Sequence, residues 1–400
     1  MLRLSSLTIH KFRNVAPNTT LRFAGGMNLV LGQNGTGKTT LLELIVCAVN
    51  LNFDRYDTEE LEIGFEFEDA NLQASAKFRF SHALAKPQYA ELALDRETLV
   101  RTIESTWTWD AGSFQLISNN NKLLFIPQVP TETEPQSFRD GLFVLAYSPQ
   151  LRSIRSLVWT FALRSMLVDF VRFDESLSYI ANLMATETLS LPLASVSAEA
   201  NVENSSLHAA LSKSFVGEQR ALSASSGVPF LASATRLFRA SALRAELGFH
   251  QALATAKNGT VFFYKGLNFI LTRGRSTLTF ENFSYGQKRL LGALHYFSEN
   301  NDIIVADELT NGLHHEWIDF LIKELGERQS FLTSQNPVLL DFLTFDSAAD
   351  VSQRLIRCTM NDDGELHWCN IPTAEAEDFF ITYSANMQQV GEIMRIQGLW

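Results

Sequence analysis

A glycine-rich run has the composition of a loop that binds phosphate. It reads Gly32-Gln33-Asn34-Gly35-Thr36-Gly37-Lys38-Thr39 and matches the pattern GxxxxGK[ST] at every fixed position. Glycines let backbone N–H groups turn toward phosphate oxygens, and the N-terminus of a following helix adds partial positive charge. In this pattern the lysine reaches the β- and γ-phosphates and the hydroxyl ligates Mg²⁺. We therefore predict phosphate contacts from Asn34, Gly35, Gly37, Lys38, Thr39 and Thr40, with Thr39 also binding Mg²⁺.

Two adjacent acidic residues, Asp307 and Glu308, follow an apolar run. The run Ile303-Ile304-Val305-Ala306 is typical of a buried strand. Mg²⁺ prefers hard oxygen ligands beside phosphate, so the Asp307 carboxylate is predicted to bind it directly or through water. Glu308 is predicted to position or deprotonate an attacking water molecule.

A third segment with polar chemistry lies between these two motifs. It reads Phe283-Ser284-Tyr285-Gly286-Gln287-Lys288-Arg289 and precedes LLGALHYF, which has a helical pattern. A helix N-terminus presents N–H groups, here beside a serine hydroxyl, to a phosphate. This segment therefore has the chemistry of a second phosphate contact.

The elements that must position these motifs can be read from the hydrophobic pattern. A short apolar run at 27–32 predicts a buried strand before the phosphate loop, and 39–50 predicts a helix after it. LEIGFEFED (Leu61 to Asp69) alternates apolar and acidic residues, which predicts a half-buried strand, and Ala74 to Phe80 repeats the pattern as its antiparallel partner.

Strand patterns resume in the last third of the chain. They cover Thr260 to Phe280, Asp302 to Glu308 and Ser330 to Pro337. RLIRCTM and LHWCNI flank Asn361-Asp362-Asp363-Gly364, which predicts a hairpin because Asp-Gly supplies positive φ angles.

The middle of the chain has a different character. Arg-dotted apolar stretches such as SLVWTFALRSMLVDFVRF predict helices from Leu151 on. A weakly patterned Ala/Ser-rich section follows, and a further helix is expected from Thr235 to Ala256. No sustained heptad pattern is present, so we expect a compact helical insertion at 151–257 in place of a long coiled-coil arm.

Composition limits the class of protein. Apolar residues make up 46% and charged residues 19% of 400 residues, which fits a globular chain with a sizeable core. The three cysteines form no CxxC pair and are expected to be free thiols. The N-terminus has no apolar leader and no apolar run reaches the length of a membrane helix, so we expect a cytoplasmic protein without membrane contact.

The net charge of −11 is unevenly distributed. Lys213 to Arg289 holds 11 basic and 3 acidic residues, whereas 290–400 holds 5 basic and 18 acidic residues. A basic segment can contact DNA through its phosphates. The alternative is that it packs against the acidic part of its own chain.

The motifs resemble those of ABC-type ATPases. Ser284, Gly286 and Gln287 match the LSGGQ signature, with Tyr285 replacing a glycine. The resemblance implies that these three residues contact a phosphate of the ATP held by the other protomer. Asp307 to His314 (DELTNGLH) resembles the DEPENGLHP run of SMC-like and overcoming-lysogenization-defect (OLD) ATPases more than a transporter's DEPTSALD. The resemblance covers about 1–50, 140–150 and 260–345.

Further roles follow from this resemblance alone. Lys11-Phe12-Arg13-Asn14 resembles the NFR opening of these heads, which implies that Arg13 approaches the nucleotide. Tyr147-Ser148-Pro149-Gln150 stands where they place the Q-loop, so Gln150 is the candidate to touch Mg²⁺ and the γ-phosphate, with Gln128 as its rival.

One position departs from the family pattern. Family members carry a switch histidine in TTHSP, whereas this chain reads Thr333-Ser334-Gln335-Asn336-Pro337. Gln335 can orient water or donate to phosphate, but it cannot carry a charge or exchange a proton near neutral pH. This predicts slow hydrolysis, with ATP acting largely as a clamp.

The resemblance implies an α/β fold, an ABC ATPase head (P-loop NTPase) with an antiparallel β subdomain and a helical insertion. Residues 1–150 and 258–400 are expected to form its two lobes. It implies ATP and Mg²⁺ as ligands, a homodimer closed around ATP, and a partner effector such as a nuclease in bacterial anti-phage defence. A DNA repair or recombination ATPase is the alternative, and a transporter subunit is third.

Overall fold

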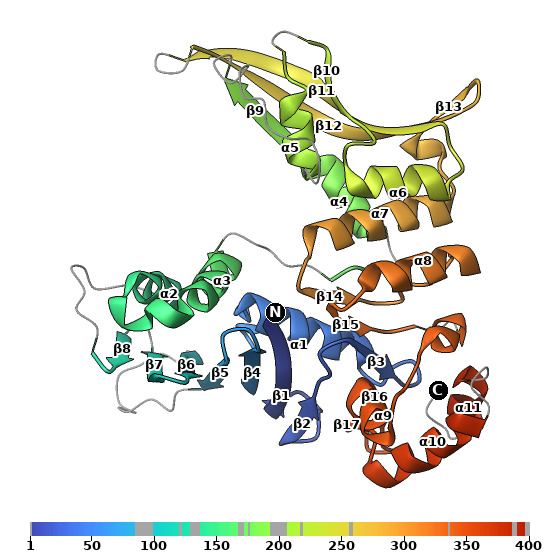
Figure 1. Ribbon diagram of the computed structural model, residues 1–400. Coiled ribbons are helices and arrows are strands. Elements are labelled where there is room, and N and C mark those ends of the chain that lie inside the picture. Colours follow the sequence, from blue (N-terminus) through green and yellow to red (C-terminus); the bar gives the residue numbers. More distant parts are fainter. Residues whose placement is uncertain are drawn as a thin grey trace. The chain divides into compact units, whose positions relative to one another are not determined.

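The computed structural model divides the protein into two compact units built from interleaved segments (Figure 1). The first unit comprises Met1–Arg172, Asp302–Asp307 and Glu327–Trp400, and the second comprises Phe173–Asn301 and Glu308–Gly326. The expected segment 1–150 lies within the first unit, whereas boundaries between the units fall inside the expected segments 151–257 and 258–400. The structure describes residues 2–84, 99–119, 122–128, 137–166, 172–174, 177–192, 206–216, 219–255, 259–334, 337–385 and 390–396.

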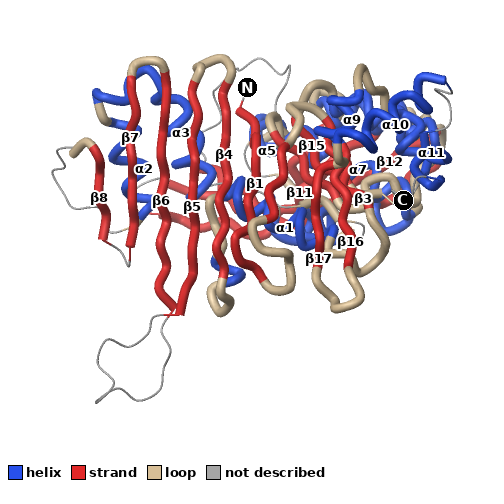
Figure 2. The backbone as a smooth tube through the Cα atoms, turned by 90° about the horizontal axis from the view of Figure 1, so that it is seen from below, coloured by secondary structure: helices blue, strands red, loops and turns tan. Residues whose placement is uncertain are grey.

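A seven-stranded antiparallel sheet forms one layer of the first unit (Figure 2). The alternating pattern at Leu61–Asp69 gives strand β4, and its predicted antiparallel pairing with β5 is confirmed, with Phe65 opposite Phe78. In sheet order the strands are β2 (Thr19–Arg22), β1 (Leu2–Phe12), β4 (Leu61–Asp69), β5 (Ala74–Leu84), β6 (Leu99–Trp109), β7 (Gly112–Asn119) and β8 (Lys122–Ile126).

A second sheet in this unit carries the phosphate loop. β3 is central, parallel to both neighbours and buried over four of its five residues, as its continuous apolar run predicts. The predicted hairpin is confirmed: β16 and β17 pair antiparallel across a turn in which Gly364 has a φ of +81°. The order is β14 (Ile303–Ala306), β15 (Gln329–Leu332), β3 (Met27–Leu31), β16 (Leu355–Met360) and β17 (Leu366–Asn370).

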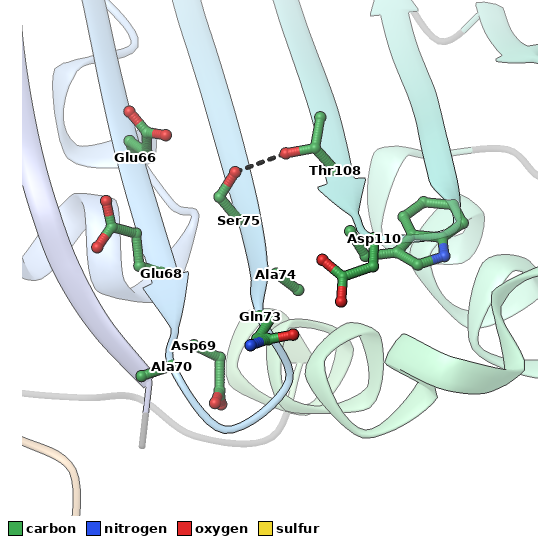
Figure 3. Close-up of a pocket in the computed structure, with 10 residues that line it drawn as sticks. Glu66, Glu68, Asp69, Ala70, Gln73, Ala74, Ser75, Thr108 and Asp110 are labelled. Carbon is green, nitrogen blue, oxygen red and sulfur yellow. Dashed lines mark hydrogen bonds between the residues drawn. The ribbon is translucent and has the colours of Figure 1, made fainter.

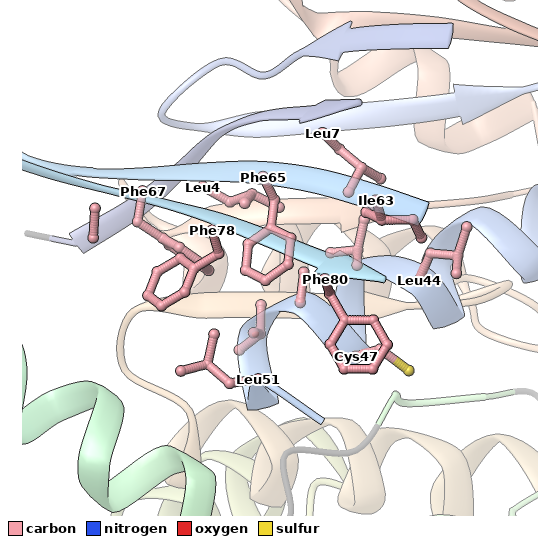
Figure 4. Packing of buried hydrophobic residues seen from close by; sticks show 14 of the residues in the cluster. Leu4, Leu7, Leu44, Cys47, Leu51, Ile63, Phe65, Phe67, Phe78 and Phe80 are labelled. Carbon is pink, nitrogen blue, oxygen red and sulfur yellow. The ribbon is translucent and has the colours of Figure 1, made fainter. Parts of the chain in front are cut away.

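The apolar core of the first unit lies against helix α1 (Lys38–Asn50). Figure 4 shows Leu44 and Cys47 of this helix, and Leu51 directly after it, beside Phe65 and Phe80 of the antiparallel sheet. The unit's other helices are α2 (Phe138–Tyr147), α3 (Arg155–Met166), α9 (Ala348–Arg354), α10 (Thr373–Ala385) and α11 (Val390–Ile396), with 3₁₀ turns at Asp54–Tyr56, Pro149–Ile154 and Pro337–Phe342.

The second unit is a mixture of helices and antiparallel strands. Its sheet has the order β10 (Ala221–Ala224), β11 (Ala242–Thr255), β12 (Gly259–Arg273) and β13 (Ser276–Thr279), with β9 (Thr188–Pro192) also paired to β12. The helices are α4 (Ser178–Thr186), α5 (Leu207–Lys213), α6 (Pro229–Leu237), α7 (Tyr285–Glu299) and α8 (His315–Leu325), with a 3₁₀ turn at Phe280–Asn282.

The helix expected from Thr235 to Ala256 is wrong. Only the end of α6 is helical there, and β11 begins at Ala242 and pairs with β12 along its length. Residues 151–257 therefore do not form a purely helical insertion. The α/β class with an antiparallel sheet is confirmed.

None of the helices in the described ranges is both long and apolar enough to cross a bilayer. The three cysteines are free thiols, as predicted, and two of them are buried. Burial raises the pKa of the Cys47 thiol to about 12, so this thiol is not a reactive thiolate at neutral pH.

Candidate functional site

The predicted phosphate loop lies between β3 and α1 with the backbone that its glycines permit. Gly35 and Gly37 have φ angles of +86° and +81°, and Gly37 caps α1. A Cβ atom on Gly37 would lie 2.8 Å from the Trp368 ring, whereas one on Gly35 would meet nothing within 4 Å. The loop therefore needs glycine at Gly37 for both conformation and space, and at Gly35 for conformation.

Lys38 lies folded over this loop. Its Nζ donates to the carbonyl oxygens of Gly32 at 2.7 Å and Gln33 at 3.0 Å. The Thr36 hydroxyl donates to the same Gln33 carbonyl at 2.8 Å. The ammonium group is thus held where the loop curves, within reach of a phosphate that the loop would surround.

Trp368 supports the loop from the hairpin β16–β17. Its indole Nε1 donates to the Thr36 carbonyl at 2.9 Å, and the side chain is buried. Sequence reasoning found this hairpin but missed its contact with the loop. A tryptophan in a strand gives no signal of which distant carbonyl its N–H will reach.

Asp307 follows β14 and lies beside Thr39, as predicted. The Thr39 hydroxyl donates to Asp307 Oδ2 at 2.7 Å, and the Thr333 hydroxyl of the next strand's end donates to Oδ1. A hydroxyl and a carboxylate held this close are the hard oxygen donors that Mg²⁺ takes alongside phosphate. Among the described residues, no cluster of three or more His, Cys, Asp or Glu side chains could hold a metal ion.

Arg172 completes this group and was missed by sequence reasoning. Its Nη1 lies 2.9 Å from Asp307 Oδ2, and its Nη2 lies 4.0 Å from Glu43. The run VRFDES around it matches no motif, so no signal in the sequence marked this arginine.

In the second unit the predicted signature segment begins helix α7. Ser284 is the N-cap, and it forms a capping box with Gln287: the Gln287 N–H donates to the Ser284 hydroxyl at 3.3 Å, and the Ser284 N–H donates to the Gln287 side chain at 2.9 Å. A Cβ atom on Gly286 would lie 2.8 Å from the Gly312 carbonyl. Glycine at this position therefore allows the two backbones to approach closely.

Glu308 is held through its backbone by an arginine of α7. The Arg289 side chain is fully buried, and its Nη2 donates to the Glu308 carbonyl. Glu308 has a φ of +53°, a left-handed conformation that costs a residue other than glycine about 1–2 kcal/mol. Such strain persists where neighbours enforce it, and it is concentrated at functional sites.

The nucleotide contacts of Arg13, Gln150 and Gln335 stay predictions. The Arg13 guanidinium forms a bidentate pair with Glu59, at 2.6 and 2.7 Å, which raises the pKa of Arg13 and lowers that of Glu59. Gln150 lies in a 3₁₀ turn after α2, and both it and Gln128 are exposed. Gln335 lies outside the described residues.

A separate cavity of about 400 Å³ opens at the ends of β4–β5 and β6–β7 (Figure 3). Two of its acids are paired, Glu68 with Arg3 at 3.0 Å and Glu66 with Lys77 at 3.3 Å. Asp69 accepts from backbone N–H groups of its own turn. Local structure thus accounts for these acids.

The phosphate loop between β3 and α1, with Asp307 beside Thr39 on this α/β fold, defines a P-loop protein, as the sequence indicated. The chain belongs to the family described as "AAA domain, putative AbiEii toxin, Type IV TA system", whose model matches residues 27–341. This family match covers both predicted phosphate contacts and the Asp-Glu pair.

Matches to individual proteins either cover a small part of this chain or have a low sequence identity. Over 44 residues the chain is 50% identical to the DNA replication and repair protein RecF of Shewanella loihica (strain ATCC BAA-1088 / PV-4), a stretch that covers 11% of this chain and 12% of that protein. The SMC head bound to the C-winged helix domain of ScpA covers 93% of this chain and 99% of its own, at 12% identity and a TM-score of 0.46. The SMC head domain of Thermotoga maritima covers 92% and 99%, at 12% identity and a TM-score of 0.40.

Proposed function

We propose that the protein binds Mg²⁺-ATP at the loop 32–39 and hydrolyses it slowly. The observation that carries the proposal is the Thr39–Asp307 hydrogen bond of 2.7 Å next to the glycine-rich loop. In this loop the Lys38 ammonium donates to the backbone carbonyls of Gly32 and Gln33. Lys38 and the N–H groups at the start of α1 would bind the phosphates, and Thr39 and Asp307 would hold Mg²⁺. Bound Mg²⁺ would neutralise charge on the phosphates.

The hydrolytic step is assigned to Glu308 and Gln335. Glu308 carries the carboxylate that would orient or deprotonate water. Gln335 stands at the switch position and supplies a neutral amide in place of histidine, which supports positioning but adds no charge in the transition state. Arg13 and Gln150 are assigned to the nucleotide and to Mg²⁺ on the resemblance alone.

Two copies are proposed to close head to tail around ATP. Ser284 and Gly286 of one copy would contact the ATP held by Lys38 of the other. ATP can drive this closure only through a higher affinity for the closed dimer than for the open state.

The closed dimer is proposed to act as a switch for a partner effector, such as a nuclease, in anti-phage defence. The words "putative AbiEii toxin, Type IV TA system" in the description of its family support a function that involves a second component. A role on DNA is the second candidate. The 50% identity over 44 residues with a DNA replication and repair protein favours it. Within the basic 213–289 segment, Arg244 pairs with Glu246, and Arg239 pairs with Glu316 of the acidic part.

Lys38→Ala tests the nucleotide site. We expect roughly a 10- to 100-fold loss of affinity for a fluorescent ATP analogue in Mg²⁺, because the phosphates lose a charge-assisted hydrogen bond. Lys77→Ala is the matched control, since Lys77 is an exposed lysine paired only with Glu66 on the sheet. Equal affinity of wild type and Lys38→Ala would show that the loop is not the site.

A further inference from the structure

Arg172, the last residue of the segment Met1–Arg172 of the first unit, is paired with the carboxylate that Mg²⁺ would need. Its Nη1 shares Asp307 Oδ2 with the Thr39 hydroxyl, at 2.9 and 2.7 Å. The side chains of Arg172 and Asp307 are 18% and 13% exposed, so salt screens this pair less than a surface pair. The guanidinium therefore supplies positive charge at the oxygen where a divalent cation would also act.

The two residues after Arg172 are anchored on α7 in the second unit. Phe173 is buried, and its ring lies 5.3 Å from the Arg289 guanidinium. The Asp174 carbonyl accepts from Arg289 Nη1 at 3.0 Å. The same guanidinium donates to the carbonyl of Glu308, the residue directly after Asp307.

Two arginines thus contact the segments 172–174 and 307–308. The Arg172 side chain pairs with Asp307, and the Arg289 side chain donates to the backbone carbonyls of Asp174 and Glu308. Arg289 is on the signature helix, four residues after Tyr285, where α7 begins. A displacement of Arg172 therefore reaches the signature helix through two covalently consecutive residues, Phe173 and Asp174.

We propose that Arg172 competes with Mg²⁺ for the Asp307 carboxylate and thereby couples nucleotide binding to helix α7. This inference rests on the proposed Mg²⁺-ATP site. The guanidinium and Mg²⁺ carry like charges that would repel, and both would need lone pairs of the Asp307 carboxylate. Mg²⁺ bound to the Asp307 carboxylate would therefore weaken the Arg172–Asp307 ion pair. The resulting displacement of Arg172 would move Phe173 and Asp174, and through their contacts it would move Arg289. Arg172 is a positioning residue in this scheme.

The test measures the Mg²⁺ concentration that half-saturates binding of a fluorescent ATP analogue to the full chain. In Arg172→Gln this midpoint falls by about threefold or more, as expected when one partly buried ion pair is removed. Affinity in EDTA stays within about twofold of wild type, because Arg172 is not a phosphate ligand. Arg172→Lys keeps the charge and restores the midpoint.

Arg55→Gln is the matched control. Arg55 lies 3.4 Å from Glu43, which Arg172 also approaches, but it does not contact Asp307, so its loss leaves the midpoint unchanged. Hydrogen exchange of residues 285–292 gives the second readout. The change that Mg²⁺-nucleotide produces there in wild type is smaller in Arg172→Gln.

An unchanged or higher midpoint in Arg172→Gln overturns the proposal, and so does a wild-type exchange response of α7 in that variant. Weaker binding of Arg172→Gln in EDTA also overturns it, since Arg172 would then bind phosphate. If the wild-type protein binds no nucleotide, the proposed function itself is wrong. If it binds nucleotide but the Mg²⁺ midpoint is the same in Arg172→Gln, only the proposed role of Arg172 is wrong.

Discussion

His295 is a buried titratable residue on the signature helix. Its ring Nδ1 is 2.9 Å from the Tyr179 hydroxyl, and Phe230 packs edge-on against it with ring centroids 5.1 Å apart. Burial penalises the charged form and lowers the pKa of His295 to about 4. The imidazole is therefore neutral in the folded protein across the physiological range.

The free energy of unfolding should consequently decrease as the pH falls, and protonation of His295 should account for part of this decrease. In the unfolded chain the imidazole takes up a proton below about pH 6.5, whereas in the folded protein it does so only near pH 4. Folding is thus opposed as pH falls through this window, by about 2 kcal/mol between pH 6.5 and 5. Urea unfolding of His295→Gln should lack this part of the pH dependence. Parallel profiles for the two proteins would contradict the assignment.

The chemistry of single residues was predictable where a motif fixes it. Thr39 and Asp307 meet because the loop after β3 and the acid after β14 follow strands of the same parallel sheet. Arg172 and Trp368 were not predictable, because each reaches the site from a segment whose local pattern carries no information about its distant partner. The sequence therefore indicated the loop and the acid beside it, and it missed the residues that support them.

At the scale of elements, the start of α7 packs against the turn that follows the Asp-Glu pair. Gly312 has a φ of +71°, and a Cβ atom there would lie 2.6 Å from Tyr285 Cε1. Tyr285 stands where the LSGGQ pattern has a glycine. The tyrosine ring and the glycine are thus a matched pair, and a side chain at 312 has no space.

Gly312→Ala should lower the free energy of unfolding by about 2–4 kcal/mol, because it adds a clash to left-handed strain. Gly274→Ala is the control for strain alone: its φ is +59°, and a Cβ there meets nothing within 4 Å. Denaturant unfolding should give about 1 kcal/mol for that control. In a Tyr285→Ala background the cost of Gly312→Ala should approach that of the control. A cost unchanged by Tyr285→Ala would show that the ring is not the obstacle.

Elements were predictable when burial and local propensity agreed. β4 and β5 were predicted because Phe and Ile alternate with charged residues. β11 was not, because its Ala, Leu, Arg and Glu residues favour helix by propensity, while Leu243, Ala245 and Leu247 alternate into the core and pair with β12. Tertiary pairing overrode local preference there.

At the scale of the whole molecule, the variant Glu308→Gln tests whether the dimer forms around ATP when hydrolysis is blocked. The variant should bind ATP but release phosphate roughly 10²–10⁴ times more slowly, the usual worth of a general base. Light scattering after gel filtration should then show a dimer in ATP and Mg²⁺. Glu68→Gln, a change at an exposed carboxylate paired with Arg3, is the control and should behave as wild type. A Glu308→Gln protein that stays monomeric would count against closure around ATP.

The support that Trp368 gives to the phosphate loop has an optical consequence. The indole donates to the Thr36 carbonyl, and its ring occupies the space next to Gly37. Indole emission responds to the polarity and hydrogen bonding around the ring, and this ring has the loop itself as its neighbour. A shift of the loop around a ligand would be recorded in the near-ultraviolet emission of the unlabelled protein. The chain thus carries an intrinsic reporter at the one place where nucleotide is proposed to arrive.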